Sequence, residues 1–226
     1  MADMLKLKSS IDGFEFEALH ADAQGKRRGG VIVIQEIFGL DRYVHEDVAR
    51  WAAKGFEVLA PSMFDRQKPG FVAEHDPAAM QVGIQYAMAN GQENPVSDVQ
   101  ACADYLKDKG PVFIVGYCYG GTVAWNAASK VSGLAAASSY YGGWIANLLD
   151  VKLNCPVICH FGRKDAHIAA DSIKAAIEAA HPEAPVYIYE NSGHGFNNDG
   201  RPDADPSDAE LARQRTLALF EANGAL

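Results

Sequence analysis

Uninterrupted runs of β-branched and aliphatic residues recur along the chain, and each ends in glycine or polar residues. Gly30-Val31-Ile32-Val33-Ile34 is such a run, and Val112-Phe113-Ile114-Val115 resembles it. A strand without an alternating polar face is typical of the centre of a parallel sheet, where both faces are buried. Further strands are predicted over residues 56–61, 134–141, 156–161 and 185–190.

Helical periodicity fills the intervals between these runs. In residues 43–54 the apolar positions Val44, Val48 and Trp51 fall on one helical face, and Gly55 ends the pattern. Residues 62–77 are rich in polar residues, proline and glycine, so we expect a loop that borders a pocket. The other predicted helices cover residues 77–90, 96–106, 122–130, 169–180 and 206–222.

The first residues alternate between apolar and polar positions instead. This pattern predicts a β-hairpin from residues 5–9 and 15–21 that covers an edge of the sheet. The later strands alternate with helices through short loops, which specifies an α/β fold with a mainly parallel sheet and helices on both faces. We expect residues 1–226 to form one α/β domain.

One strand runs directly into a Gly-x-Cys-x-Gly turn, Gly116-Tyr117-Cys118-Tyr119-Gly120, and a predicted helix follows. Glycines on either side remove Cβ atoms that would collide in a turn this tight, so Cys118 can occupy a strained position at its apex. The helix N-terminus supplies free N–H groups and a partial positive charge, which favour a thiolate and an oxyanion. Cys118 is the predicted nucleophile, and a buried structural cysteine is the alternative.

A cysteine nucleophile needs a histidine base, and the histidine needs a carboxylate to orient it. His194 lies in a Gly-His-Gly turn after the last predicted strand, and Asp165 follows the preceding one. The carboxyl ends of parallel strands meet at one edge of the sheet, so Cys118, Asp165 and His194 are expected to share a site. His167 is a rival base, and Asp171 is a rival carboxylate.

Charge and composition exclude several classes of function. The chain has 20 basic and 29 acidic residues and a net charge of −9, which argues against binding to nucleic acid or to an anionic membrane surface. No apolar run approaches the roughly 20 residues that span a bilayer, and the N-terminus lacks a signal-peptide pattern. We therefore expect a cytoplasmic protein, either a monomer or a small homo-oligomer.

The four cysteines are too few and too irregular for a disulfide scaffold, and they suit a reducing compartment. Cys155 and Cys159 lie four residues apart on a predicted strand, but two further ligands at metal-binding spacing are missing, so packing in the core is favoured over a metal site. No metal or organic cofactor is predicted, because a thiolate and an aligned imidazole suffice for acyl transfer.

Four motifs together resemble the dienelactone hydrolase family, the carboxymethylenebutenolidases of the α/β-hydrolase superfamily. The motifs are Gln35-Glu36-Ile37-Phe38-Gly39-Leu40, Gly116-Tyr117-Cys118-Tyr119-Gly120-Gly121, the turn from Gly162 to Asp165, and Gly193-His194-Gly195-Phe196. The resemblance runs from about residue 10 to residue 222 and implies an α/β-hydrolase fold. It also implies hydrolysis of an activated enol ester, a lactone, through a thioester acyl-enzyme.

The resemblance assigns further roles at the site. Glu36 would be a fourth catalytic residue that moves towards the thiol when substrate binds and helps to deprotonate it; its alternative is an ion-paired carboxylate at a strand end. The backbone N–H groups of Ile37 and Tyr119 would form the oxyanion hole, as the superfamily arrangement implies.

The chain departs from the family where the substrate carboxylate would bind. Family members hold it with two arginines, but no arginine lies between Arg66 and Arg163, and none lies in the five positions after His194. Arg66, Lys68 or Arg201 are candidate replacements, and a solvated surface charge is the alternative for each. Phe38, Tyr86 and Trp144 are candidate pocket-lining residues or core residues.

We therefore predict a hydrolase for a small-molecule ester or lactone. One alternative is a carboxylesterase or thioesterase for neutral substrates, which the missing arginines favour. The other is a binding or redox-sensing module that keeps the reactive thiol without turnover.

Overall fold

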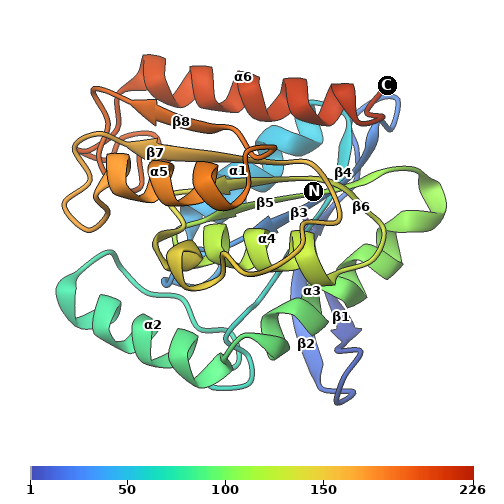
Figure 1. The fold of residues 1–226 in the computed structure, drawn as a ribbon. Helices are drawn as coiled ribbons and strands as arrows, with labels where there is room; N and C mark the ends of the chain where they lie inside the picture. Colours follow the sequence, from blue (N-terminus) through green and yellow to red (C-terminus); the bar gives the residue numbers. More distant parts are fainter. Residues whose placement is uncertain (1) are drawn as a thin grey trace.

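The computed structural model describes residues 2–226, which form one eight-stranded sheet with helices on both faces (Figure 1). The strand order is β1-β2-β4-β3-β5-β6-β7-β8. The strands are β1 (Asp3–Lys8), β2 (Glu15–Ala21), β3 (Gly29–Ile34), β4 (Phe56–Pro61), β5 (Val112–Tyr117), β6 (Leu134–Tyr140), β7 (Val157–Gly162) and β8 (Val186–Tyr189). The helices are α1 (Arg42–Ala53), α2 (Pro77–Asn90), α3 (Glu93–Leu106), α4 (Tyr119–Lys130), α5 (Ala170–Ala180) and α6 (Pro206–Ala222), with 3-10 turns η1 (Lys107–Lys109) and η2 (Gly143–Asn147).

The sheet is mostly parallel. Strands β4, β3, β5, β6, β7 and β8 pair in parallel, whereas β1 and β2 form the predicted antiparallel hairpin and β2 pairs antiparallel with β4. Every residue of β3, β4 and β5 is buried, as expected for strands covered on both faces. The α/β prediction with an N-terminal hairpin is confirmed.

The helices form two layers that cover opposite faces of the sheet. Helices α1 and α6 pack on one face, where Trp51 and Phe220 meet Phe56 and Phe113 of the sheet. Helices α3, α4 and α5 cover the opposite face, and α2 lies outside this layer (Figure 1). No helix in residues 2–226 has the length and apolar character needed to cross a bilayer.

Two predicted helix starts are late by about a turn. Helix α4 begins at Tyr119, whereas the sequence pattern predicted residue 122. Helix α3 begins at Glu93, whereas the sequence pattern predicted a loop up to Pro95. The first N–H groups of a helix have no intrahelical acceptor, so a proline in the first turn removes no hydrogen bond. Pro95 therefore lies within the helix and does not mark its start.

Candidate active site

The Gly-x-Cys-x-Gly turn joins β5 to α4 and strains the backbone of Cys118. Its φ is 55° and its ψ is −114°, a conformation that non-glycine residues rarely adopt. The flanking glycines make the turn feasible, because a Cβ at Gly116 would lie 1.9 Å from the carbonyl oxygen of Gly120. The Cys118 N–H donates to the carbonyl of Tyr140 at 3.0 Å, which ties the apex to β6. The thiol thus lies at the carboxyl edge of the sheet.

The loops after β7 and β8 bring Asp165 and His194 together. The Nδ1 of His194 lies 2.7 Å from Oδ2 of Asp165, and Oδ1 of the same carboxylate accepts the N–H groups of His167 at 2.7 Å and Ile168 at 3.1 Å. Burial alone would raise the pKa of Asp165, but these hydrogen bonds hold its pKa below the ordinary value. The carboxylate is therefore ionised and fixed towards the imidazole.

The pKa of His194 depends on Asp165 and Cys118. Burial lowers the pKa of His194, but its hydrogen bond with Asp165 and its interaction with the Cys118 thiol outweigh burial and raise the pKa to about 10. A histidine with a raised pKa stabilises an adjacent thiolate as an ion pair. The rival base and the rival carboxylate do not form such a pair. His167 contributes only its backbone N–H to Asp165. Asp171 is exposed and pairs with Arg163 at 2.6 Å.

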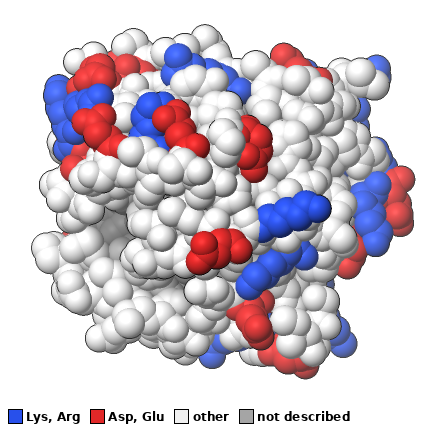
Figure 2. Space-filling view, in the orientation of Figure 1, with Lys and Arg blue, Asp and Glu red and all other residues white. Residues whose placement is uncertain are grey.

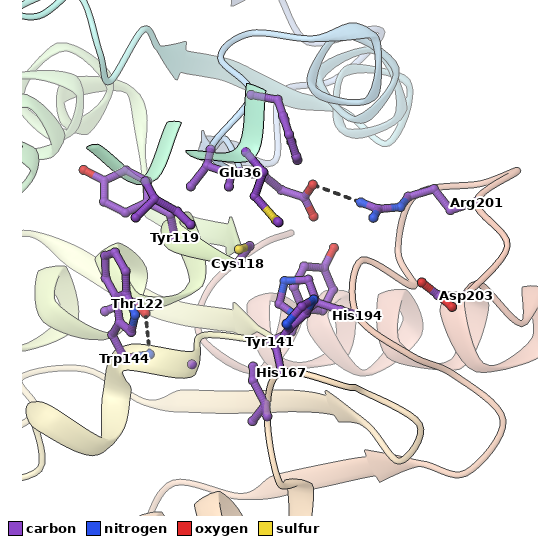
Figure 3. A pocket seen from close by; sticks show the side chains of 16 residues that line it. Glu36, Cys118, Tyr119, Thr122, Tyr141, Trp144, His167, His194, Arg201 and Asp203 are labelled. Carbon is purple, nitrogen blue, oxygen red and sulfur yellow. Dashed lines mark hydrogen bonds and ion pairs between the residues drawn. The ribbon is translucent and has the colours of Figure 1, made fainter. Parts of the chain in front are cut away.

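Glu36 lies just after β3, in the wall of the same pocket as Cys118. Its Oε2 accepts a hydrogen bond from Nη1 of Arg201 at 3.2 Å, and Figure 3 shows the carboxylate turned towards Arg201. Its Oε1 is buried without a hydrogen-bond partner among the described residues, and the hydroxyl of Tyr141 is in the same situation. Two buried polar atoms in this pocket are thus left for a bound molecule or a rotated Glu36 to satisfy.

Two residues that line the pocket with Cys118 have backbone N–H groups without a backbone acceptor among the described residues. Tyr119 is the first residue of α4, so its N–H has no acceptor in a preceding helical turn. Ile37 lies in the loop after β3, and its N–H makes no backbone hydrogen bond within the described part of the chain. Both residues line the pocket with Cys118, an arrangement suited to an oxyanion.

The pocket has a volume of about 320 Å³, and three of the substrate-binding candidates from the sequence, Phe38, Trp144 and Arg201, lie in its lining. Trp144 is 42% exposed at its border. Tyr141 and Asp203 also line the pocket, but the sequence did not point to them. Tyr141 stands at the end of β6, so the carboxyl-edge rule applied to this strand would have found it; Asp203 lies in an irregular loop that carries no such signal.

The structure does not bring Arg66 or Tyr86 into this pocket. Arg66 is 11% exposed in its side chain and pairs with Asp98 at 2.5 Å and Asp12 at 3.1 Å, which ties the N-terminal hairpin to α3. Tyr86 packs against Phe64 and Phe71. Lys68, the third candidate cation, lies over the ring of Phe71.

Comparison with known proteins assigns the chain to a family. The dienelactone hydrolase family model matches residues 16–224. The chain belongs to the dienelactone hydrolase family.

Its relatives in that family match over most of their length. Carboxymethylenebutenolidases of Pseudomonas putida and Pseudomonas knackmussii are each 29% identical over 217 residues, covering 92% of this chain and 92% of each relative. The crystal structure of a candidate dienelactone hydrolase from Klebsiella pneumoniae superimposes with a TM-score of 0.81 at 25% identity, covering 98% and 99% of the two chains. A dienelactone hydrolase-like phosphotriesterase from metagenomic libraries shares the fold at 20% identity, with a TM-score of 0.77 and 98% of each chain covered. The chain is thus a carboxymethylenebutenolidase-like hydrolase with an α/β-hydrolase fold.

Elsewhere in this dienelactone hydrolase-like chain, one group of side chains has the composition of a metal site. Ligand atoms of His20, Asp22 and Glu57 lie within 4.8 Å of one another. Glu57, however, already accepts hydrogen bonds from Arg27 at 2.8 Å and from Lys109 at 3.2 Å. These two cations supply the charge that a metal would bring, so the group is an ion-pair cluster.

Two other cysteines, Cys155 and Cys159, pack in or against the hydrophobic core. Burial raises the pKa of the Cys155 thiol to about 11 and that of the Cys159 thiol to about 12, so both remain protonated near neutral pH. Cys159 lies in β7 and is fully buried.

Proposed function

We propose that this chain hydrolyses a lactone or an activated ester through a thioester on Cys118. The observation that carries the proposal is the 2.7 Å hydrogen bond between His194 and Asp165 beside a cysteine held at a strained strand–helix turn. A buried structural cysteine needs neither the strain nor the pair. The family relationship supports ester hydrolysis as the reaction class.

The reaction proceeds in two acyl-transfer steps. The Cys118 thiolate attacks the carbonyl carbon, and the developing oxyanion accepts hydrogen bonds from the N–H groups of Ile37 and Tyr119. Collapse of this intermediate breaks the bond to the leaving oxygen, which takes a proton from the His194 imidazolium and leaves a thioester. Water then gives a proton to neutral His194 and attacks the thioester, which releases the acid and restores the thiolate–imidazolium pair. Asp165 orients the imidazole throughout.

Arg201 and Glu36 give this cycle a dependence on the charge of the substrate. A substrate carboxylate in the pocket would compete with Glu36 for the guanidinium of Arg201, and arginine binds carboxylates well. Glu36 would then be free to turn towards Cys118 and, where the thiol is still protonated, help His194 to deprotonate it. Arg201 is the proposed replacement for the missing family arginines, since it is the one Lys or Arg among the described residues that line the pocket.

A specific observation favours the second candidate, an esterase or thioesterase for neutral substrates. Arg201 already pairs with Glu36 at 3.2 Å, so its positive charge is opposed by a carboxylate, and Asp203 adds a second negative charge to the lining of the pocket. Helix α2 carries no charged residue, and Figure 2 shows an uncharged surface over it with a hollow beside it. An apolar, uncharged entrance suits neutral esters.

Stopped-flow hydrolysis of p-nitrophenyl acetate and of a cis-dienelactone separates these candidates. We expect both substrates to react in the parent, and we expect Cys118→Ala to abolish both reactions. Mass spectrometry of the parent, quenched early, should show a covalent acetyl adduct on the peptide that contains residue 118. Arg201→Gln should lower kcat/KM for the dienelactone at least tenfold and change that for the neutral ester much less.

The alternatives give different results. Turnover that persists in Cys118→Ala would refute the cysteine mechanism. If the parent turns over only the neutral ester, the dienelactone assignment fails and the esterase assignment stands. An acyl adduct that forms without steady hydrolysis would identify a binding or sensing module instead.

A further inference from the structure

A second cavity of about 140 Å³ adjoins the catalytic pocket. Tyr119, Thr122 and Trp144 line both, so these three residues form the border between them. Trp144 lies in η2, and its backbone N–H donates to the Thr122 hydroxyl at 3.3 Å. The two cavities therefore meet at this border, and a substrate chain that extended from the catalytic pocket over Trp144 would reach the second cavity.

The second cavity is polar without charge. Three side-chain amides, those of Gln92, Asn126 and Asn147, lie among its lining residues. Gly91, Pro95, Val123 and Leu148 also line it. No Asp, Glu, Lys, Arg or His occurs among the described residues that line it. Such a lining suits an uncharged group that donates and accepts hydrogen bonds at the end of an apolar chain.

Asn126 has unused hydrogen-bonding capacity here. It is 3% exposed, its Nδ2 donates to the carbonyl of Gln92 at 3.2 Å, and its Oδ1 has no partner among the described residues. A buried amide oxygen without a donor costs free energy, so a donor from a bound molecule would be favourable after a small side-chain adjustment.

The chemistry of the reaction decides which part of a substrate reaches this cavity. The leaving oxygen must lie near His194, because it takes its proton from that imidazole. Figure 3 shows Thr122 and Trp144 on one side of Cys118, with Arg201 and Asp203 on the other side, beyond His194. The second cavity therefore lies on the acyl side of the scissile bond.

From this geometry we propose that the second cavity is an acyl-chain subsite that selects esters of acids with a neutral, hydrogen-bonding end group. The inference rests on the proposed hydrolysis through Cys118. At the ~30 Å³ that a water molecule occupies in the liquid, 140 Å³ holds about four or five non-hydrogen atoms. A primary amide with its last methylenes fits that volume.

The test compares three p-nitrophenyl esters that share one leaving group. They are the acetate, the 5-carbamoylpentanoate, which ends in a primary amide, and the 6-methylheptanoate, its apolar isostere. In the parent we expect kcat/KM to be at least tenfold higher for the 5-carbamoylpentanoate than for the acetate. We also expect the amide to exceed its isostere at least threefold.

Two variants act on different parts of the subsite. Asn147→Trp, a substitution at an exposed position, should fill the cavity and bring the ratio of 5-carbamoylpentanoate to acetate close to one. Asn126→Leu should remove the preference for the amide over its isostere. Gln214→Trp, on the exposed surface of α6, is the matched control and should leave both ratios at the parent values.

Each result bears on the inference. A parent that hydrolyses acetate fastest, or an Asn147→Trp variant that keeps the parent ratios, would overturn it. Equal rates for the amide and its isostere in the parent would refute the proposed end-group selection. Failure of the parent on all three esters, acetate included, would instead count against the proposed function.

Discussion

At the scale of single residues, His194 connects every part of the proposed chemistry. Its Nδ1 forms a hydrogen bond with Asp165, the Cys118 thiol lies in the same pocket, and both groups raise its pKa against the opposing effect of burial. The same interactions that prepare it for catalysis therefore also contribute to stability. They do so only while the imidazole is charged.

The stability of the protein should reflect this pKa. The pKa of His194 is about 10 in the folded state and roughly 6.5 in an unfolded chain, so its contribution is complete below about pH 6.5 and is lost as pH rises through 10. We expect the difference in unfolding free energy between the parent and His194→Gln to shrink steadily from pH 7 to pH 10. Urea unfolding at several pH values measures it.

His45 provides the matched control, because it is exposed on α1. His45→Gln should follow the parent at every pH. A difference between the parent and His194→Gln that stays constant from pH 7 to pH 10 would contradict the raised pKa.

At the scale of elements, α2 is fitted against the proposed oxyanion hole. A Cβ built on Gly83 of α2 would lie 2.1 Å from the carbonyl oxygen of Ile37, whose N–H is a proposed oxyanion donor. Only glycine allows the helix to approach the loop after β3 so closely. The position of Ile37 thus depends on a helix that follows it by more than forty positions in the chain.

Gly83→Ala should lower kcat by about 10- to 100-fold, since displacement of one oxyanion donor weakens transition-state stabilisation. Alanine is the better helix former by about 1 kcal/mol, so a weaker helix would not explain the loss. Steady-state kinetics on p-nitrophenyl acetate, with the Tm measured alongside, tests this expectation. Gln85→Ala, at an exposed position of α2, is the control. An unchanged kcat in Gly83→Ala would mean that α2 moves without disturbing the loop.

At the scale of the whole molecule, a buried carboxylate connects distant parts of the chain behind the nucleophile. Asp47 of α1 accepts hydrogen bonds from the Tyr117 hydroxyl at 2.7 Å, from Trp51 Nε1 at 3.2 Å and from Arg50 at 2.5 Å. Arg50 in turn pairs with Asp199 in the loop after His194. The residue before Cys118 is thereby anchored to α1 and to the histidine loop.

Loss of this acceptor should destabilise the protein substantially. Asp47→Ala leaves the buried Tyr117 hydroxyl and Trp51 indole without a partner, and breaking such a network costs about 3 kcal/mol. For a chain of this size we expect the Tm to fall by roughly 6–12 °C, as measured by calorimetry. Asp150→Ala, at an exposed site, should change it by no more than about 2 °C. A similarly small shift in Asp47→Ala would show that the network contributes little.

The sequence alone determined the order and type of the elements, because uninterrupted apolar runs and helical periodicity are local properties of the chain. It also determined the turn around Cys118, since Gly116 and Gly120 are required there by backbone sterics. The meeting of Asp165 with His194 followed from one topological rule, that parallel strands present their carboxyl ends at one edge.

Only the tertiary structure decided how the charges are paired. The sequence offered both Arg66 and Arg201 as candidates for the same role. In the structure Arg66 pairs with Asp98, whereas Arg201 pairs with Glu36 in the pocket. Arg201 lies in an irregular loop without periodicity, and its partner Glu36 is 165 positions away along the chain, so no local pattern encodes the contact. The second cavity beside Trp144 is decided in the same way, because its walls come from α3, α4, η2 and the turn after α2, and their packing alone creates the space.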